Sequence, residues 1–260
     1  MIHKGNSRFY YQYPYPDIKF KDKKSVLKGP FAWRMRTILR VLKIKSEDFK
    51  GKKVLDIGCG TGEKPIFYAL YGAQVDAIDQ SEESLKCARH KAKELGLKIN
   101  FMCSDLFKFK YIMKYDYVFC LGVLHHTSNP YLGFEKIVSA VKPNCKICIG
   151  LYHRYGRLPT TLSRFVLSLL PVSIDTKLRL IKRLFQNRWL NDRVIYDRFL
   201  VPYESTHTLK EVEKWFRNNK ISLLSCHPEP KGLFGELGWL NRKGFFIVSG
   251  VLSGKSSGKN

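Results

Sequence analysis

The sequence predicts an α/β protein in which helices cover both faces of a parallel β-sheet. Three observations support this fold class. From residue 53 onward, apolar runs of strand length alternate with segments of helical periodicity. A glycine-rich turn at residues 58–62 joins the first apolar run to a helical segment. Acidic residues stand where the next strands end, at the edge where an open parallel sheet binds its ligands.

Length and composition indicate a globular protein without a membrane span. The chain has 260 residues, of which 44% are hydrophobic and 13% aromatic, as expected of a protein with a buried core. No apolar run reaches the ~18 residues of a membrane-spanning helix. The N-terminus lacks an apolar segment typical of a signal peptide. We therefore expect a cytoplasmic protein with one elaborated domain or two small ones.

The cysteines predict neither disulfides nor a metal site. There are seven, mostly within expected strands, so we expect reduced thiols. Cys145 and Cys148 have the spacing of a redox or metal pair, but residues three apart in a strand point to opposite faces. No second Cys or His pair stands at zinc spacing. We interpret both as core residues.

The net charge of +24 is unevenly distributed. Residues 1–50 carry 13 basic and 4 acidic groups, and residues 151–200 carry 10 and 3. This excess favours a polyanionic partner such as nucleic acid, an anionic membrane surface or a phosphorylated substrate. The alternative is solvated charge without a partner. Nothing in the sequence indicates an oligomeric state.

Residues 1–50 are expected to form an N-terminal arm and a helix. Residues 8–16 are rich in aromatic side chains and end in two prolines, which favour an extended arm. Tyr13 and Tyr15 would cover the mouth of a ligand site or pack on the body of the protein. Pro30 begins an amphipathic helix to about residue 43, which we expect across the rim of the sheet.

Strands and helices then follow in alternation. Ser81 is suited to cap the helix that follows the second strand, and two glutamates stand in its first turn. A turn is expected at residues 143–144. The expected strands are residues 54–57, 74–79, 97–103, 115–121, 146–151, 221–226 and 244–252, and the expected helices begin near residues 63, 81, 131 and 208.

The segment 152–205 interrupts this alternation between the fifth and sixth strands. Residues 158–170 and 174–189 have the pattern of amphipathic, basic helices. We therefore predict a helical insert. Residues 253–260, rich in Ser, Gly and Lys, are expected to be a disordered tail.

Polar residues at the strand ends predict a nucleoside site. Asp56 lies in the first strand just before the glycines, and Asp79 ends the second strand, 17 residues after Gly62. At the position of Asp79, a carboxylate accepts two hydrogen bonds from a ribose diol and repels a phosphate. Ser104 and Asp105 end the third strand and suit the edge of a base.

The motifs at these positions resemble those of class I S-adenosylmethionine-dependent methyltransferases. Val-Leu-Asp-Ile-Gly-Cys-Gly-Thr-Gly (54–62) is similar to the family's first motif, Ile-Asp-Gln-Ser (78–81) to the second and Cys-Ser-Asp-Leu (103–106) to the adenine-edge motif. The segment 115–126, ending in Leu-Gly-Val-Leu-His-His, resembles the fourth. The resemblance covers residues 53–152 and more loosely extends to 252. It implies a methyltransferase domain over residues 51–252 with a Rossmann-like, seven-stranded sheet whose last strand is antiparallel.

The resemblance also implies the cofactor site. The cofactor would be S-adenosylmethionine. Its binding residues would be Asp56, Gly58, Cys59, Gly60, Gly62, Asp79, Gln80, Ser104, Asp105, Leu106 and Leu121. An NAD site is disfavoured because the Gly-x-Gly-x-Gly spacing is tighter than the dinucleotide motif. No Lys or Arg lies between Asp56 and Gly62, which fits a cofactor without phosphates.

The acceptor is open to two interpretations. His125 or His126 would serve as the base, with one of them facing the pocket, since they follow strand four. Similarity to the small-molecule branch favours a small acceptor of lipid-like or anionic character, and the insert would be its lid. Candidate acceptor-binding residues are Tyr13, Tyr15, Tyr152, Tyr203, Glu204 and His207. The alternative is an RNA methyltransferase whose basic arm and insert hold phosphates.

Overall fold

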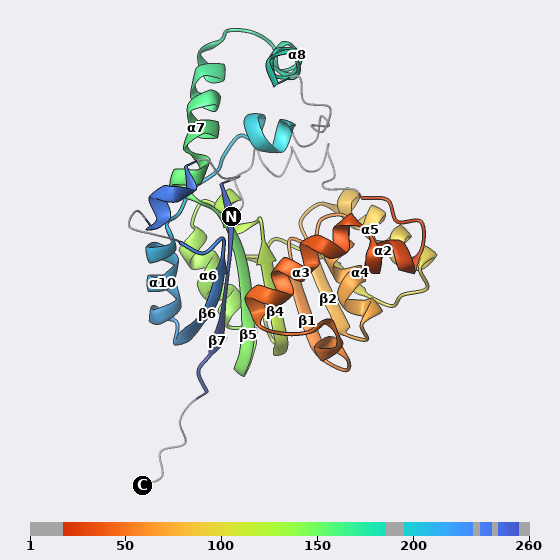
Figure 1. Cartoon of the computed structure of the whole chain (residues 1–260). Coiled ribbons are helices and arrows are strands. Elements are labelled where there is room, and N and C mark those ends of the chain that lie inside the picture. The colour runs from red at the N-terminus through yellow and green to blue at the C-terminus, as the bar shows by residue number, and fades with distance from the viewer. Residues whose placement is uncertain (1–17, 186–194, 231–234, 241–243, 255–260) are drawn as a thin grey trace.

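A computed structural model describes residues 18–185, 195–230, 235–240 and 244–254. They form a seven-stranded sheet with helices on both faces (Figure 1). The strand order is β3-β2-β1-β4-β5-β7-β6, and β7 is antiparallel to both of its neighbours. The strands are β1 (Lys53–Ile57), β2 (Gln74–Asp79), β3 (Asn100–Cys103), β4 (Tyr115–Leu121), β5 (Val141–Tyr152), β6 (Ile221–His227) and β7 (Phe245–Leu252). The predicted fold class is confirmed.

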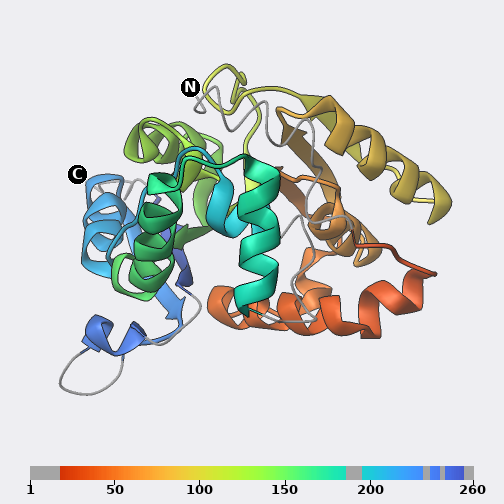
Figure 2. The same ribbon diagram turned by 90° about the horizontal axis from the view of Figure 1, so that it is seen from above.

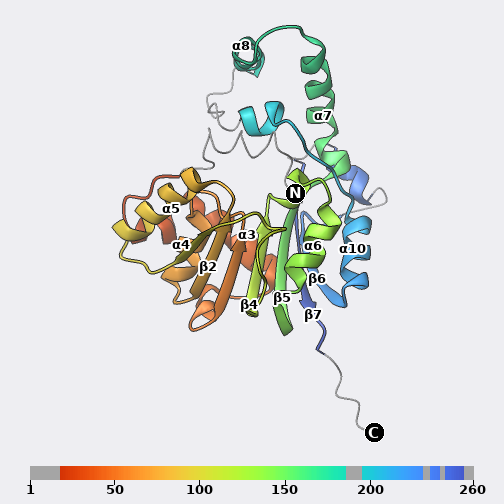
Figure 3. The same cartoon turned by 180° about the vertical axis from the view of Figure 1, so that it is seen from behind.

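Helices cover the two faces of this sheet in two groups, which Figures 1 and 3 show from opposite sides. One face packs against α6 and α10, and the other against α3, α4 and α5. The helices are α2 (Lys23–Lys28), α3 (Pro30–Leu42), α4 (Glu63–Leu70), α5 (Glu82–Glu94), α6 (Pro130–Val138), α7 (Arg154–Leu169), α8 (Ile174–Phe185) and α10 (Leu209–Asn218). Short 3-10 turns are η1 (Ser46–Phe49), η2 (Leu124–His126) and η4 (Gly235–Trp239), and η3 (Tyr196–Leu200) is a π-helix.

The central strand β1 explains why the sheet is buried on both sides. Val54 packs into the cluster beneath α3 and α4, whereas Leu55 and Ile57 pack into the cluster beneath α6. All three side chains are at most 1% exposed. A continuous apolar run of this kind is what a strand covered on both faces requires.

Two expectations, about the position of α3 and about the start of β5, were wrong in detail. Helix α3 does not lie across the rim of the sheet but packs on its face, where the Ser225 and Ser249 hydroxyls donate to the Val41 carbonyl. Pro143 and Asn144 do not form a turn before β5 but lie within it, at a shift in its register with β4. Asn144 has φ +61°, which the extra residues of a bulge accommodate.

The insert between β5 and β6 is helical, as predicted. Its elements α7, α8 and η3 rise above the carboxyl ends of the parallel strands (Figures 1 and 2). They share a small apolar core of Leu167, Leu178, Ile181, Ile195 and Phe199. The last part of the second predicted helix and the end of the tail (255–260) lie outside the described residues.

Candidate functional site

The glycine turn closes tightly at the carboxyl end of β1. Gly58, Gly60 and Gly62 have φ of +68°, +56° and +89°, a region that favours glycine. The amides of Gly58 and Cys59 both donate to the Ile78 carbonyl, at 2.8 and 3.0 Å. A Cβ on Gly58 would lie 2.2 Å from a methyl group of Val123, so the turn has no room for a side chain there.

The Asp79 carboxylate is fixed at the end of β2 by two backbone amides. The Gly60 amide donates to its Oδ2 at 2.8 Å, and the Ser81 amide donates to its Oδ1 at 2.9 Å. Burial raises the pKa of Asp79, and these amide hydrogen bonds oppose that rise. The carboxylate therefore has a fixed orientation with acceptor capacity left on both oxygens.

A cavity of about 770 Å³ extends from this turn along the carboxyl edge of the sheet. It is large enough for a nucleoside and part of a second molecule. Of the residues predicted from sequence, those that line it are Gly58, Cys59, Gly60, Asp79, Gln80, Ser104, Leu106, Leu121, His125, His126 and Tyr152. One contiguous space thus joins the predicted cofactor positions to the predicted bases.

The other predicted residues are not among the described residues that line this cavity. Asp56 lies fully buried beneath the turn, Gly62 begins α4, and Asp105 accepts the Phe107 amide at 2.7 Å. Tyr203, Glu204 and His207 also lie outside the lining. Tyr13 and Tyr15 lie outside the described residues.

A lysine that the sequence analysis did not consider lies at the turn. The Lys64 ammonium, on the first turn of α4, is 3.5 Å from Oδ2 of Asp56 and lines the cavity. Burial raises the pKa of Asp56 to about 6, and Lys64 opposes this rise. Burial acts to lower the pKa of Lys64, but the attraction of Asp56 outweighs it and the pKa is raised. The sequence between Asp56 and Gly62 contains no Lys or Arg, but Lys64 still places a positive charge at the turn.

Both histidines after β4 line the cavity, although only one was expected to do so. Their rings, 4.3 Å apart, are 1% and 4% exposed, and the His125 ring packs 3.9 Å from the Tyr152 ring. In the described part of the chain, neither ring nitrogen of His125 has a hydrogen-bond partner. Burial lowers the pKa of His125 well below its usual value, assisted by His126 and Arg157. His125 is therefore neutral near pH 7 and has a free nitrogen.

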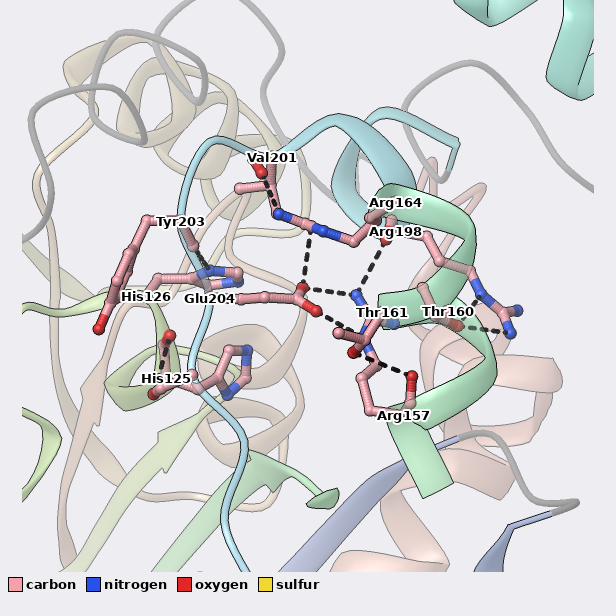
Figure 4. Close-up of polar contacts among 11 residues, drawn as sticks. His125, His126, Arg157, Thr160, Thr161, Arg164, Arg198, Val201, Tyr203 and Glu204 are labelled. Carbon is pink, nitrogen blue, oxygen red and sulfur yellow. Dashed lines mark hydrogen bonds and ion pairs between the residues drawn. The ribbon is translucent and has the colours of Figure 1, made fainter. Parts of the chain in front are cut away.

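Residues 201–205 hold this histidine pair in place (Figure 4). The Tyr203 carbonyl lies 3.0 Å from Nδ1 of His126, and the Ser205 amide donates to the His125 carbonyl at 2.7 Å. Between these two residues, Glu204 points the other way, toward α7. His207 continues the same segment and is held by Glu211 at 2.8 Å and by the Ser205 hydroxyl at 2.9 Å.

Glu204 anchors this segment to α7 through a buried ion-pair cluster (Figure 4). Its carboxylate accepts from Arg157 at 2.7 and 3.1 Å and from Arg164 at 3.1 Å. Glu204 and Arg157 are only 6% and 3% exposed. The Arg157 guanidinium also covers the Tyr152 ring at 3.7 Å. The cluster therefore connects the insert, through Tyr152 and residues 203–205, to the two histidines.

The remaining cavity wall is mostly apolar, and the sequence analysis missed it. On α3 it includes Phe31, Met35 and Ile38, and on β7 Phe245 and Ile247. Among the described residues, no group of three or more His, Cys, Asp or Glu side chains is arranged to hold a metal ion. The described helices include none long and apolar enough to cross a membrane.

Comparison with curated proteins gives partial matches. A ubiquinone biosynthesis O-methyltransferase of Coxiella burnetii is 32% identical over 106 residues, which are 40% of this chain and 45% of that protein. One from Salmonella enteritidis is 26% identical over 155 residues, 58% and 64% of the two chains. The matched stretch of the first of these relatives is thus about half of its length.

Solved structures share the fold over most of the chain. A magnesium protoporphyrin IX methyltransferase from Synechocystis, with bound S-adenosylhomocysteine, has a TM-score of 0.62 at 18% identity and covers 95% of this chain and all of that one. An N-methyltransferase from Bradyrhizobium japonicum, also with S-adenosylhomocysteine, has a TM-score of 0.55 at 12% identity, with 95% and 98% coverage.

The sequence pattern of the methyltransferase domain matches residues 48–187, from just before β1 into the insert. That stretch contains the glycine turn, Asp79 and the histidine pair. Because the match covers more than half of the chain, the protein belongs to the methyltransferase domain family.

Proposed function

We propose that the protein is an S-adenosylmethionine-dependent methyltransferase that acts on a small molecule. The observation that carries this proposal is one cavity that is lined both by the glycine turn and Asp79 and by His125, whose ring has no hydrogen-bond partner among the described residues. The membership of the methyltransferase domain family supports the reaction class. The solved relatives with bound S-adenosylhomocysteine support the cofactor.

The residues at the turn fit this cofactor. The two oxygens of Asp79 are presented to the cavity with acceptor capacity for a ribose diol, and Ser104 and Leu106 line the space beside them. The positive charge of Lys64 does not require a phosphate on the ligand, because the Asp56 carboxylate beneath it supplies an opposite charge. Asp79 would bind the ribose, Gln80 would lie beside the adenine, and the glycine turn would face the amino acid part.

His125 would accept the acceptor's proton. When bound, S-adenosylmethionine would supply a methyl group on a sulfonium, activated for transfer to an acceptor atom held in line with it. A hydroxyl acceptor is a poor nucleophile until its proton is removed. The neutral imidazole of His125 lines the cavity with no hydrogen-bond partner in the described part of the chain, and Tyr152 and the Ser205 amide fix its position. The chain's own part is therefore to bind, to orient and to take up one proton.

The cavity wall favours an acceptor with an apolar body. Phe31, Met35, Ile38, Phe245 and Ile247 line the space beyond the glycine turn. Such a wall binds an aromatic or aliphatic body mainly by removing its surface from water. The relatives named ubiquinone biosynthesis O-methyltransferases support an oxygen acceptor of this general kind.

RNA is the weaker candidate acceptor. It was predicted to bind the basic arm and the basic insert; residues 1–17 of the arm lie outside the described residues, and in the insert Arg157 and Arg164 turn inward onto Glu204. A guanidinium that is 3% exposed, such as that of Arg157, is not available to a phosphate.

A transfer assay with labelled S-adenosylmethionine tests the proposal. The full chain is incubated in parallel with a small-molecule extract, a lipid extract and total RNA. We expect label in a small molecule with an apolar body, and a loss of at least about 100-fold in His125→Gln. His126→Gln is the matched variant, and a smaller loss is expected since its ring is held by the Tyr203 carbonyl. Label only in RNA, or none in any fraction, would refute the proposed function.

A further inference from the structure

One face of helix α7 carries a ridge of exposed apolar side chains. Its members within α7 are Leu158, Leu162, Phe165, Val166 and Leu169, which are 52–66% exposed. Their spacing of four, three, one and three residues places them on one side of a helix. The ridge continues over the turn to α8 with Val172 at 41% and Ile174 at 60%. We call these seven residues the α7 ridge.

Among the described residues, the packing of the insert does not use the α7 ridge. Helix α7 uses its opposite side, with buried Gly156, Thr160 and Leu167, to contact the rest of the protein. Leu167 joins Leu178 and Ile181 of α8 in the apolar core of the insert. A helix of a soluble protein normally turns such a stripe inward, so an exposed ridge of this extent indicates a contact surface.

Positive charge accompanies the ridge. Between residues 154 and 183 the sequence has seven basic residues and one acidic residue, of which Arg157 and Arg164 turn inward onto Glu204 and Arg154 pairs with Glu211. Arg179, Lys182 and Arg183 are exposed on α8, whereas its apolar Leu178 and Ile181 are buried. Apolar side chains that enter the acyl region, next to cations that meet anionic headgroups, are the combination that holds a helix at a bilayer surface.

The position of the ridge relates it to the cavity. Helix α7 begins two residues after Tyr152, which lines the cavity, and the insert rises from the carboxyl edge of the sheet (Figures 1 and 2). Trp33, which is 71% exposed, also lines the cavity. Exposed tryptophans are favourable at membrane interfaces.

We infer that the α7 ridge docks this protein onto the surface of a bilayer that contains anionic lipid. An acceptor with an apolar body, as the proposed function implies, would then reach the cavity from the membrane rather than from water. A bilayer explains both the apolar ridge and its basic neighbours. RNA would account for the basic neighbours but not for the apolar ridge. Another copy of the chain docked on the ridge would bring like charges together.

Co-sedimentation of the full chain with sucrose-loaded vesicles tests this inference. We expect binding to vesicles of phosphatidylcholine mixed with phosphatidylglycerol, and much weaker binding to phosphatidylcholine alone. In Leu162→Glu/Phe165→Glu the partition coefficient should fall at least about tenfold. Ile112→Glu alters a side chain that is 80% exposed outside the insert, and it should bind like the wild type.

A second pair of variants tests the charge. Arg179→Gln/Arg183→Gln should lower the partition coefficient roughly thirtyfold, because each basic residue near an anionic surface adds about 1 kcal/mol. Lys108→Gln/Lys110→Gln removes two exposed charges elsewhere and should have little effect. Thermal melting and S-adenosylmethionine affinity, measured on each variant, separate a loss of docking from a loss of fold or of the proposed activity.

Four results would overturn the inference. One is no binding to either kind of vesicle. Another is equal binding by the wild type and Leu162→Glu/Phe165→Glu, which would indicate charge attraction without the ridge. The third is a dimer in sedimentation velocity that only the ridge variant dissociates, with no vesicle binding, which would make the ridge a contact between copies. Loss of RNA binding in Arg179→Gln/Arg183→Gln, again without vesicle binding, would assign the charges to RNA.

Discussion

Replacement of Glu204 by Gln tests the ion-pair cluster that connects the insert to the histidine pair. The change keeps the shape of the side chain but removes the charge that Arg157 and Arg164 share. Arg164 is 18% exposed and can turn partly toward water, whereas Arg157, at 3%, cannot. Glu204→Gln therefore removes from the buried Arg157 guanidinium the counter-charge that Glu204 supplies.

The expected cost follows from this burial. Removal of one partner of a buried ion pair lowers the free energy of unfolding by about 3–5 kcal/mol. Because Arg164 can relax, we expect a value near 3 kcal/mol. For a domain of this size, 1 kcal/mol corresponds to roughly 2–4 °C in Tm, so Tm should fall by about 6–12 °C.

Glu211→Gln is the matched control. Glu211 also pairs with an arginine and a histidine, Arg154 at 3.3 Å and His207 at 2.8 Å, but it is 33% exposed. Exposed pairs contribute about 1 kcal/mol or less, so Tm should fall by no more than about 4 °C. Differential scanning calorimetry on both variants decides the matter. A Tm for Glu204→Gln as high as that for Glu211→Gln would show that the cluster does not hold the segment.

Three further predictions concern the glycine turn and the histidine pair. Burial raises the pKa of Asp56 to about 6, so its contribution to stability is full below pH ~4 and is lost as the pH rises through 6. As the pH rises across that range, the free energy of unfolding of Asp56→Asn should therefore increase by up to about 3 kcal/mol relative to that of the wild type. Calorimetry at several pH values measures this difference. Burial lowers the pKa of His125, so its contribution is present above pH ~6.5 and is lost as the pH falls. Below pH ~6.5 the free energy of unfolding of the wild type should fall, relative to that of His125→Gln, by up to about 1.4 kcal/mol per pH unit. Denaturation measured at several pH values tests this, and the same pH dependence of stability in both proteins would refute it. Gly58→Ala should lower Tm and cofactor affinity, since its φ is +68° and its Cβ would meet Val123 at 2.2 Å. Added Val123→Ala should restore part of the Tm, and no recovery would contradict the contact.

The features that the sequence predicted well depend on local pattern. The strands at residues 74–79 and 115–121 have the predicted bounds, and Ser81, Thr208 and Pro30 begin their helices as expected. Apolar periodicity, capping side chains and glycines at positive φ are properties of neighbouring residues. Motif spacing likewise placed Gly60 and Asp79 together across 19 residues, because two adjacent strands end at the same edge.

The features that it missed depend on contacts between distant segments. Lys64 reaches Asp56 only because α4 folds back beside β1, and the apolar wall requires α3 to pack on the sheet rather than on its rim. Glu204 was expected near the acceptor because residues 201–212 resemble the small-molecule branch, but the structure places its carboxylate against two arginines of α7. No spacing rule relates residue 204 to residues 157 and 164.

Calorimetric titration with S-adenosylmethionine tests the central claim most directly. Asp79→Asn changes the carboxylate that faces the cavity, and Asp76→Asn changes a carboxylate on the same strand that instead accepts from the Tyr115 hydroxyl. We predict saturable one-to-one binding for the wild type and Asp76→Asn, and an affinity at least about tenfold lower for Asp79→Asn, since hydrogen bonds to a charged group contribute about 1.5–3 kcal/mol. No binding by the wild type, or undiminished binding by Asp79→Asn, would contradict the assignment of this cavity.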